Sequence, residues 1–204
     1  ILSVRPGDTL RIELDDGSTG TAVGTADVEI LVDPFGLTFD SGDGAPVDGS
    51  IVTIVDAVTG APAAVFGDDG VSAFPSTIIT GSTVTDSSGR IYAFTPGFYR
   101  FPFLRQGTYR FIVTPPAPYT YPSVATPAEL AALIRPDGGP FIIAPGSYGG
   151  TITLLDPAPV RIDIPLDRPG GRANHQDPIP QGSARMAPRL ALVTGASAGN
   201  GAAI

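Results

Sequence analysis

The 204-residue chain contains no cysteine, no lysine and no tryptophan, and it has one histidine and one methionine. Without cysteine, disulfides and thiolate metal sites are excluded, so the compartment cannot be deduced from redox chemistry. The one imidazole, His175, has no acid–base partner beside it, so neither a catalytic triad nor an imidazole metal site is supported. No apolar run approaches the ~20 residues of a transmembrane helix, and we expect no membrane span.

Negative charge is carried almost entirely by aspartate. There are seventeen Asp and three Glu against twelve Arg, which gives a net charge of −8. Aspartate in turns accepts hydrogen bonds from nearby backbone, so this bias fits a loop-rich β protein. A surface this acidic repels phosphate backbones, and we therefore expect no nucleic-acid partner.

Short segments with strand periodicity follow one another closely from about residue 33 onward. In residues 107–114, Tyr109, Phe111 and Val113 share one face and polar residues share the other, which predicts a strand with one buried face. Residues 51–55 carry apolar side chains on both faces, which predicts a strand in the middle of a sandwich. Further strands are expected at 35–39, 77–85, 90–94, 99–103, 141–144, 151–155 and 159–164.

One helix is expected among these strands. Thr126 is a suitable N-cap, Pro127 suits the first helical position, and Glu129 completes a capping box before the apolar run LAALI. The segment RPDG at 135–138 ends this helix.

Residues 39–60, FDSGDGAPVDGSIVTIVDAVTG, carry a turn of the form G-x-P-V-x-G between two strands. This segment resembles the opening of prealbumin-like β-sandwich repeats, which include the carboxypeptidase regulatory-like, SdrD B-like and Cna B-like modules of bacterial surface proteins. Residues 107–123 resemble their closing strand, and 159–167 resemble the end of a unit. The matching positions are Gly44, Pro46, Val47, Gly49, Val52, Thr53, Ile54 and Asp56.

The resemblance implies an all-β fold, an antiparallel Ig-like or prealbumin-like β-sandwich with one short helix. It also implies a non-enzymatic structural or presentation module of a secreted or cell-surface repeat protein. Its expected partners are neighbouring repeats of the same protein, with a protein or a glycan as candidate ligand.

Two properties of some members of this group can be checked against the sequence. Their Lys–Asn isopeptide cross-link cannot form here, because the chain has no lysine. Others bind calcium through Asp-rich loops, but calcium takes 6–8 oxygen ligands and no D-x-[DN]-x-[DN]-G loop is present. We therefore favour turn formation over metal ligation and expect no metal. The weak calcium candidates are Asp40, Asp43, Asp68 and Asp69, followed by Asp33 and Asp86.

Aromatic residues are the remaining candidates for a binding surface. A cluster between residues 92 and 103 could form a carbohydrate platform, although alternating aromatics in strands more often belong to the core. Tyr119 and Tyr121 are expected to be exposed, as a capping contact or a partner surface. The spacing of the carboxylates singles out no glycosidase pair. The cluster consists of Tyr92, Phe94, Phe98, Tyr99, Phe101 and Phe103.

The last residues, 188–204, read PRLALVTGASAGNGAAI. They resemble the first strand and turn of short-chain dehydrogenases, whose T-G-x-x-x-G-x-G pattern is matched by Thr194, Gly195, Gly199 and Gly201. The resemblance implies a truncated Rossmann-type start that would place NAD(P) phosphates at a helix N-terminus. The family's Tyr-x-x-x-Lys cannot be present without lysine, so we expect no bound cofactor and no enzyme. The alternative is a fragment of an NAD(P)-dependent short-chain oxidoreductase fusion, inactive in this form.

These observations divide the chain into five expected segments. Residues 1–32 would end an upstream β module, 33–123 would form the sandwich repeat, and 124–167 would complete it with the helix and additional strands. Residues 168–187 would be a linker, and 188–204 the truncated dinucleotide-binding start. The first residue is not methionine and the chain stops within a motif, so the sequence predicts an internal fragment.

Overall fold

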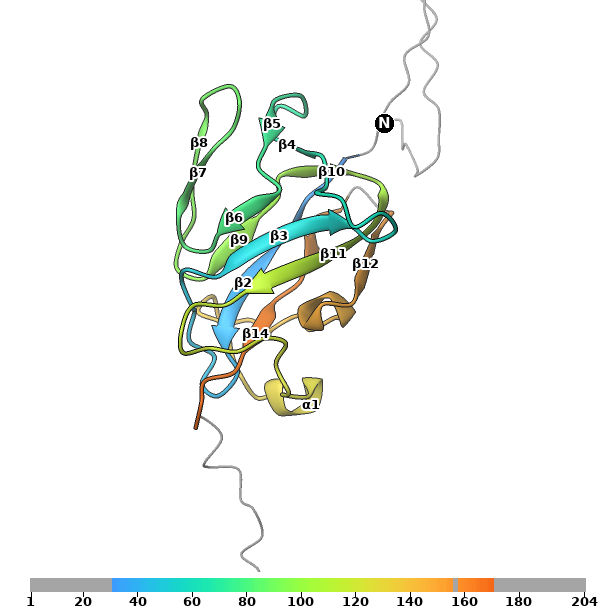
Figure 1. The fold of residues 1–204 in the computed structure, drawn as a ribbon. Helices are drawn as coiled ribbons and strands as arrows, with labels where there is room; N and C mark the ends of the chain where they lie inside the picture. Colours follow the sequence, from blue (N-terminus) through green and yellow to red (C-terminus); the bar gives the residue numbers. More distant parts are fainter. Residues whose placement is uncertain (1–30, 156–157, 171–204) are drawn as a thin grey trace, which may run out of the picture. The chain divides into compact units, whose positions relative to one another are not determined.

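A computed structural model describes residues 31–155 and 158–170, and Figure 1 shows their arrangement. The dinucleotide motif, His175, nearly all of the upstream module and the predicted linker beyond residue 170 lie outside these residues. The elements are β1 (Leu31–Val32), β2 (Pro34–Asp40), β3 (Ile51–Asp56), β4 (Val65–Phe66), β5 (Ala73–Phe74), β6 (Thr77–Ile79), β7 (Thr83–Thr85), β8 (Ile91–Ala93), β9 (Phe98–Arg100), β10 (Phe103–Arg105), β11 (Gly107–Thr114), the helix α1 (Pro127–Leu130), the 3-10 helix η1 (Pro145–Tyr148), β12 (Thr151–Leu154), β13 (Val160–Arg161) and β14 (Ile164–Leu166).

The strands form antiparallel sheets with one parallel seam. One sheet has the order β12-β11-β3-β6, and another has the order β1-β10-β4-β5. In a third sheet β2 is central, with β9 antiparallel on one side and β13 and β14 parallel on the other. Strands β7 and β8 form a separate hairpin.

The main core lies between the β12-β11-β3-β6 sheet and the two sheets that contain β1 and β2. Alternation along β11 points Tyr109 and Phe111 inward, as the sequence predicts, where they meet Tyr99, Phe101 and residues of β14. The Tyr99 and Phe111 rings meet edge to face with centroids 5.4 Å apart. In Figure 1, β3 and β11 lie in front of β2 and β14.

A smaller core covers the other face of β2. Leu37 and Phe39 pack there against Leu130 of α1 and against Phe141. The rings of Phe39 and Phe141 stack with centroids 3.7 Å apart. β2 is therefore buried on both faces, which explains its nearly uninterrupted apolar sequence PFGLTF.

The architecture confirms the predicted fold class: the described residues form an all-β sandwich with one short α-helix. Within this part of the chain, no helix has the length and hydropathy needed to cross a bilayer. The central position of β3 in its sheet agrees with the sequence. Its outer face, however, is open: Ile51 is 41% exposed and Thr53 is half-buried.

Two predicted strands are each broken into two. The expected strand at 77–85 is interrupted between β6 and β7, where Gly81 has a φ of +70° and Ser82 turns back to bond the Ile79 carbonyl. The expected strand at 99–103 is interrupted at Pro102, which has no N–H to donate, and the chain passes from the sheet of β2 to that of β1.

The C-terminal part differs most from the prediction. The capping box of Thr126 and Glu129 forms, but α1 ends at Leu130 instead of continuing to residue 134. Residues 141–144 form no strand and lead into η1. The expected strand at 159–164 is two short strands, β13 and β14, separated at Asp163, whose backbone N–H bonds the Ile142 carbonyl. Both pair parallel with β2, so residues 160–166 share a sheet with residues 34–40, while the predicted domain boundaries stay predictions.

Candidate functional site

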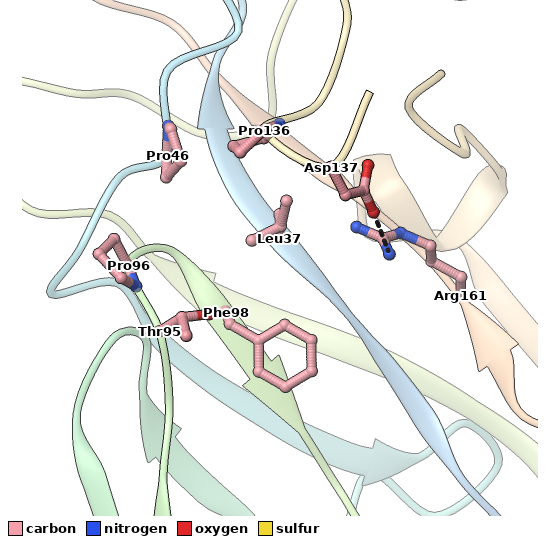
Figure 2. A pocket seen from close by; sticks show the side chains of 8 residues that line it. All are labelled: Leu37, Pro46, Thr95, Pro96, Phe98, Pro136, Asp137 and Arg161. Carbon is pink, nitrogen blue, oxygen red and sulfur yellow. Dashed lines mark ion pairs between the residues drawn. The ribbon is translucent and has the colours of Figure 1, made fainter. Parts of the chain in front are cut away.

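A groove lies beside β2 in the described part of the chain, with a volume of about 340 Å³. Its walls are mainly apolar, and one end carries an ion pair between Asp137 and Arg161, as Figure 2 shows. The remaining lining residues are Leu37, Pro46, Thr95, Pro96, Phe98 and Pro136.

The apolar floor follows from strand register. Leu37 of β2 and Phe98 of β9 are direct cross-strand partners, so their side chains lie on the same face of the sheet. Phe94 packs edge to face on Phe98 with ring centroids 5.7 Å apart. Pro46 and Pro96 come from the two turns that flank these strands, and neither has a backbone N–H to offer a ligand.

The charged end is built on Asp163, which is completely buried. Its carboxylate accepts hydrogen bonds from the backbone N–H groups of Leu37 at 2.9 Å and Ile142 at 2.8 Å, and from Arg161 Nε at 3.1 Å. The Arg161 guanidinium also lies over the Phe35 ring, 5.5 Å from its centroid. Arg161 is therefore held from both sides, and its NH1 group points to the groove, 3.6 Å from Asp137 Oδ2.

Asp137 is exposed but is not a free carboxylate. Arg135 donates to it through Nε at 2.9 Å and NH2 at 3.0 Å, and Gly139 N–H adds a third bond at 3.1 Å. The bonds from Arg135, followed by the bond from Gly139, lower the pKa of Asp137. A carboxylate with a lowered pKa and a fixed guanidinium partner is a poor general base.

Neither Asp163 nor the two arginines were singled out from the sequence. A signal was present, because Asp163 stands between two isoleucines in the otherwise apolar segment 162–166, a position where a charged residue must be paired. Arg161 lies on the same short segment as Asp163. Arg135 is distant from Asp163 along the chain, and only the fold brings it to the site.

The first pair of calcium candidates forms turn and ion-pair contacts. Asp40 accepts a hydrogen bond from Gly42 N–H at 2.8 Å and forms an ion pair with Arg168 at 2.8 Å. Asp43 accepts from Ala45 N–H at 2.9 Å. These oxygens already have protein donors, as expected for aspartate in turns.

The second pair behaves in the same way. Asp68 forms ion pairs with Arg90 at 2.8 Å and Arg100 at 2.9 Å. Asp69 accepts from the Ser72 hydroxyl at 2.5 Å and from two backbone N–H groups, and these bonds, the hydroxyl first, lower the pKa of Asp69 to about 2.

Of the two remaining candidates, Asp86 accepts from the backbone N–H groups of Ser88 and Arg90. Asp33 pairs with Arg100 through Oδ2, while its buried Oδ1 has no hydrogen-bond partner among the described residues. Burial raises the pKa of Asp33 although Arg100 opposes it, whereas hydrogen bonds led by Ser88 lower the pKa of Asp86. Across residues 31–155 and 158–170, no three His, Asp or Glu side chains gather closely enough to hold a metal ion. Calcium binding stays a hypothesis, which a calorimetric titration with calcium can decide: a flat heat trace and an unchanged Tm would remove it.

The candidate aromatic platform is largely core. Tyr92, Tyr99 and Phe101 belong to the main core, and Phe94 packs against it. Phe98 alone of the six lines the groove.

Tyr119 and Tyr121 were expected to be exposed, as a capping contact or a partner surface; the exposure is wrong, and the capping alternative agrees with the structure. Both are half-buried against the main core because their segment folds back onto it. Tyr119 donates to Asp40 and accepts from Arg168, and burial raises the pKa of Tyr121 to about 12. This segment therefore closes the module instead of presenting two tyrosines to a partner.

The sequence matches no family model and no curated protein. Among solved structures, the backbone protein of group B streptococcus pilus 2b is similar to 71% of this chain at 12% identity, with a TM-score of 0.34. The match covers 43% of that pilus protein. A likeness this distant decides neither fold nor function.

Proposed function

We propose that this chain is a non-enzymatic spacer and presentation module of a secreted or cell-surface protein. The observation that carries the proposal is the parallel pairing of β14 with β2, in which Leu166 lies opposite Asp40. Because the two strands run in the same direction, the chain arrives at one end of this sheet and departs at the other. Such a module holds its N-terminal and C-terminal neighbours apart by at least the length of β2, roughly 23 Å at 3.3 Å per residue.

The chain is held by side-chain hydrogen bonds directly after β14, where a force pulling on its C-terminal neighbour would act. The Asp167 carboxylate accepts hydrogen bonds from Ser41 Oγ at 2.5 Å, Ser123 Oγ at 2.6 Å and Val124 N–H at 2.7 Å. Asp167 also exchanges two backbone hydrogen bonds with Thr120. Tension along the chain would load these bonds and the β2–β14 ladder together, so that they must break at once rather than one by one.

Single-molecule pulling tests the spacer role. The chain has no cysteine, so cysteines added at its two ends would be unique attachment points. We expect a distinct unfolding force that falls in Asp167→Ala and is retained in Asp43→Ala, which alters a turn carboxylate that bonds only within its own turn. If unfolding shows no force peak, the module does not bear load along its axis, and if Asp167→Ala unfolds like the wild type, Asp167 does not anchor it.

The surface location is tested separately. Antibody labelling of intact cells of the source organism should detect the module without permeabilisation. Labelling that requires permeabilisation would exclude a cell-surface role.

The groove favours ligand presentation as an accompanying role. Its apolar floor and fixed Arg161 suit a ligand with an apolar body and a polar end, such as a peptide side chain beside its own backbone. A peptide library and a glycan array, each screened with the wild type and Phe98→Ala, distinguish the two ligand classes. Binding lost in Phe98→Ala supports the groove, and binding unaffected by this change would place the ligand elsewhere.

The oxidoreductase alternative has its own test. Titration of the full chain with NADP should give no saturable binding if the glycine motif is inert. Saturable binding that is lost in Gly199→Asp would instead support a nucleotide-binding role for that motif.

A further inference from the structure

The outer side of the β12-β11-β3-β6 sheet carries an exposed apolar surface, here termed the Ile–Thr face. It consists of the outward side chains of the four strands, and the inward side chains of the same strands belong to the main core. Three isoleucines on it are substantially exposed: Ile51 by 41%, Ile79 by 48% and Ile112 by 46%. Its members are Ile51, Thr53, Thr77, Ile79, Thr108, Arg110, Ile112, Thr114, Thr151 and Thr153, whereas Val55 on the same side of β3 is buried.

Strand register makes this surface continuous. Ile51 is the direct partner of Ile79 on one side and of Thr114 on the other. Ile112 lies one row along, opposite Thr53, whose hydroxyl is 2.8 Å from that of Thr77. The three isoleucines therefore occupy adjacent rows with only threonine between them, and such a contiguous apolar patch marks an interaction surface.

The charge of this face indicates what covers it. Arg110 is the only charged residue among the outward strand positions, and none of them is acidic. The whole chain has a net charge of −8, so two copies repel each other over most surfaces. Where two of these faces meet, no carboxylates are brought together, and Arg110 is the one charged residue that each copy contributes. A basic partner, in contrast, would be drawn to the acidic surfaces elsewhere on the chain.

The Ile–Thr face is also hollowed at one edge. A hollow of about 390 Å³ lies along it between β6 and β7, with Ile79, Ile51 and Val84 in its lining. Side chains of a second sheet can enter such a hollow, and in a contact with two-fold symmetry each copy offers the same hollow to the other.

We propose that the Ile–Thr face is a docking surface for a second copy of this chain, through sheet-to-sheet contact. Four strands about 4.8 Å apart and 3–8 residues long give a footprint on the order of 300–400 Å² per copy. A stable interface buries about 800 Å² per partner. The contact is therefore weak and reversible between isolated modules, and it gains strength when several modules are held close together. This inference is independent of the spacer role, because it concerns a different surface.

Sedimentation equilibrium of the full chain tests the proposal, over about 10 µM to about 1 mM, where an interface of this size dissociates. We expect the wild type to shift from monomer toward dimer across this range and Ile112→Asp to stay monomeric throughout. Ile91→Asp is the matched control, because Ile91 is an equally apolar and more exposed residue, 67%, on the separate β7–β8 hairpin. Ile91→Asp should associate like the wild type.

A second substitution separates face docking from a general effect of charge. Ile112→Arg lowers the net negative charge, so it would strengthen association driven by overall charge alone. We expect it to abolish the dimer as Ile112→Asp does, because either charge would be buried without a partner. Circular dichroism and thermal melts show whether each variant is folded, and Ile79→Asp replaces any that is not.

Three results would overturn the proposal. The first is a wild type that stays monomeric up to about 1 mM, which corresponds to an association free energy weaker than that of any functional contact between isolated modules expected here. The second is a dimer that survives both Ile112 substitutions. The third is shielding of the Ile112 methyl groups from solvent probes that does not change on dilution, since another segment of the same chain would then cover the face.

Discussion

Replacing Asp163 with asparagine tests the electrostatic support of the groove. The carboxylate is completely buried and accepts from two backbone N–H groups, of Leu37 and Ile142, and from the guanidinium of Arg161. Asparagine has nearly the same shape, but it replaces one acceptor oxygen by an NH₂ donor. That donor must face another donor, and the charge of Arg161 loses its buried counter-ion.

The size of the effect follows from these contacts. Removing one partner of a buried ion pair costs about 3–5 kcal/mol, because the other charge stays buried. A buried donor without an acceptor costs about 1–3 kcal/mol. This cost is not added to the cost of breaking the ion pair, because both describe the loss of the same carboxylate oxygen. We therefore expect a loss of about 3–5 kcal/mol, a large fraction of the roughly 5–15 kcal/mol by which a domain is stable.

Urea unfolding measures this loss. With a denaturant slope of about 1–3 kcal/mol per molar, the midpoint of Asp163→Asn should fall by more than about 1 M. Asp137→Asn is the matched control, because the same arginines contact Asp137 but its side chain is 54% exposed, and its midpoint should change little. Equal midpoints for the two variants would refute the claim that Asp163 is the buried anchor of this region.

Three further predictions concern local conformation and titration. Gly97→Ala should lower Tm more than Gly89→Ala, because a Cβ at Gly97 would lie 2.7 Å from the Thr38 carbonyl oxygen whereas Gly89 faces open space. Both glycines have positive φ, so equal Tm values for the two variants would contradict the steric argument. The pKa of Asp69 is lowered from 3.8 to about 2, so its contribution to stability is present above pH 3.8 and is lost as pH falls through about 2. The urea midpoints of Asp69→Asn and wild type should therefore converge over that interval, and a constant difference between them would contradict the lowered pKa. Thr126→Ala should cost about 1 kcal/mol by removing the helix cap, whereas Thr126→Ser should be nearly neutral in the same unfolding assay.

The sequence predicted the features that depend on neighbouring residues. Alternation in residues 107–114 identified β11 and its buried face, and Thr126 and Glu129 identified the helix start. These features are encoded by spacing along one segment. The resemblance of residues 39–60 to β-sandwich repeats led to the correct fold class by the same local pattern.

The features that the sequence did not reveal depend on segments far apart in the chain. No local signal indicates that β13 and β14 would pair parallel with β2, or that Pro102 would mark a change of sheet. The groove was missed because its charged end joins Arg135 and Asp137 to Arg161 and Asp163, and these two short segments meet only in the folded chain. The length of α1 was overestimated because residues 131–134, although good helix formers, leave the helix to pack and pair elsewhere.

The parallel seam also sets the order in which this module can be completed during synthesis. Leu37 finds its buried acceptor in Asp163, 126 residues later, and β2 has β14 as a neighbour only after residue 166 has emerged from the ribosome. Until then one edge of β2 is an unpaired apolar strand, and closing a loop this long makes the final step slow. The module therefore cannot fold progressively from its N-terminal strands, because β2 gains its parallel neighbour only when residues 164–166 have been made.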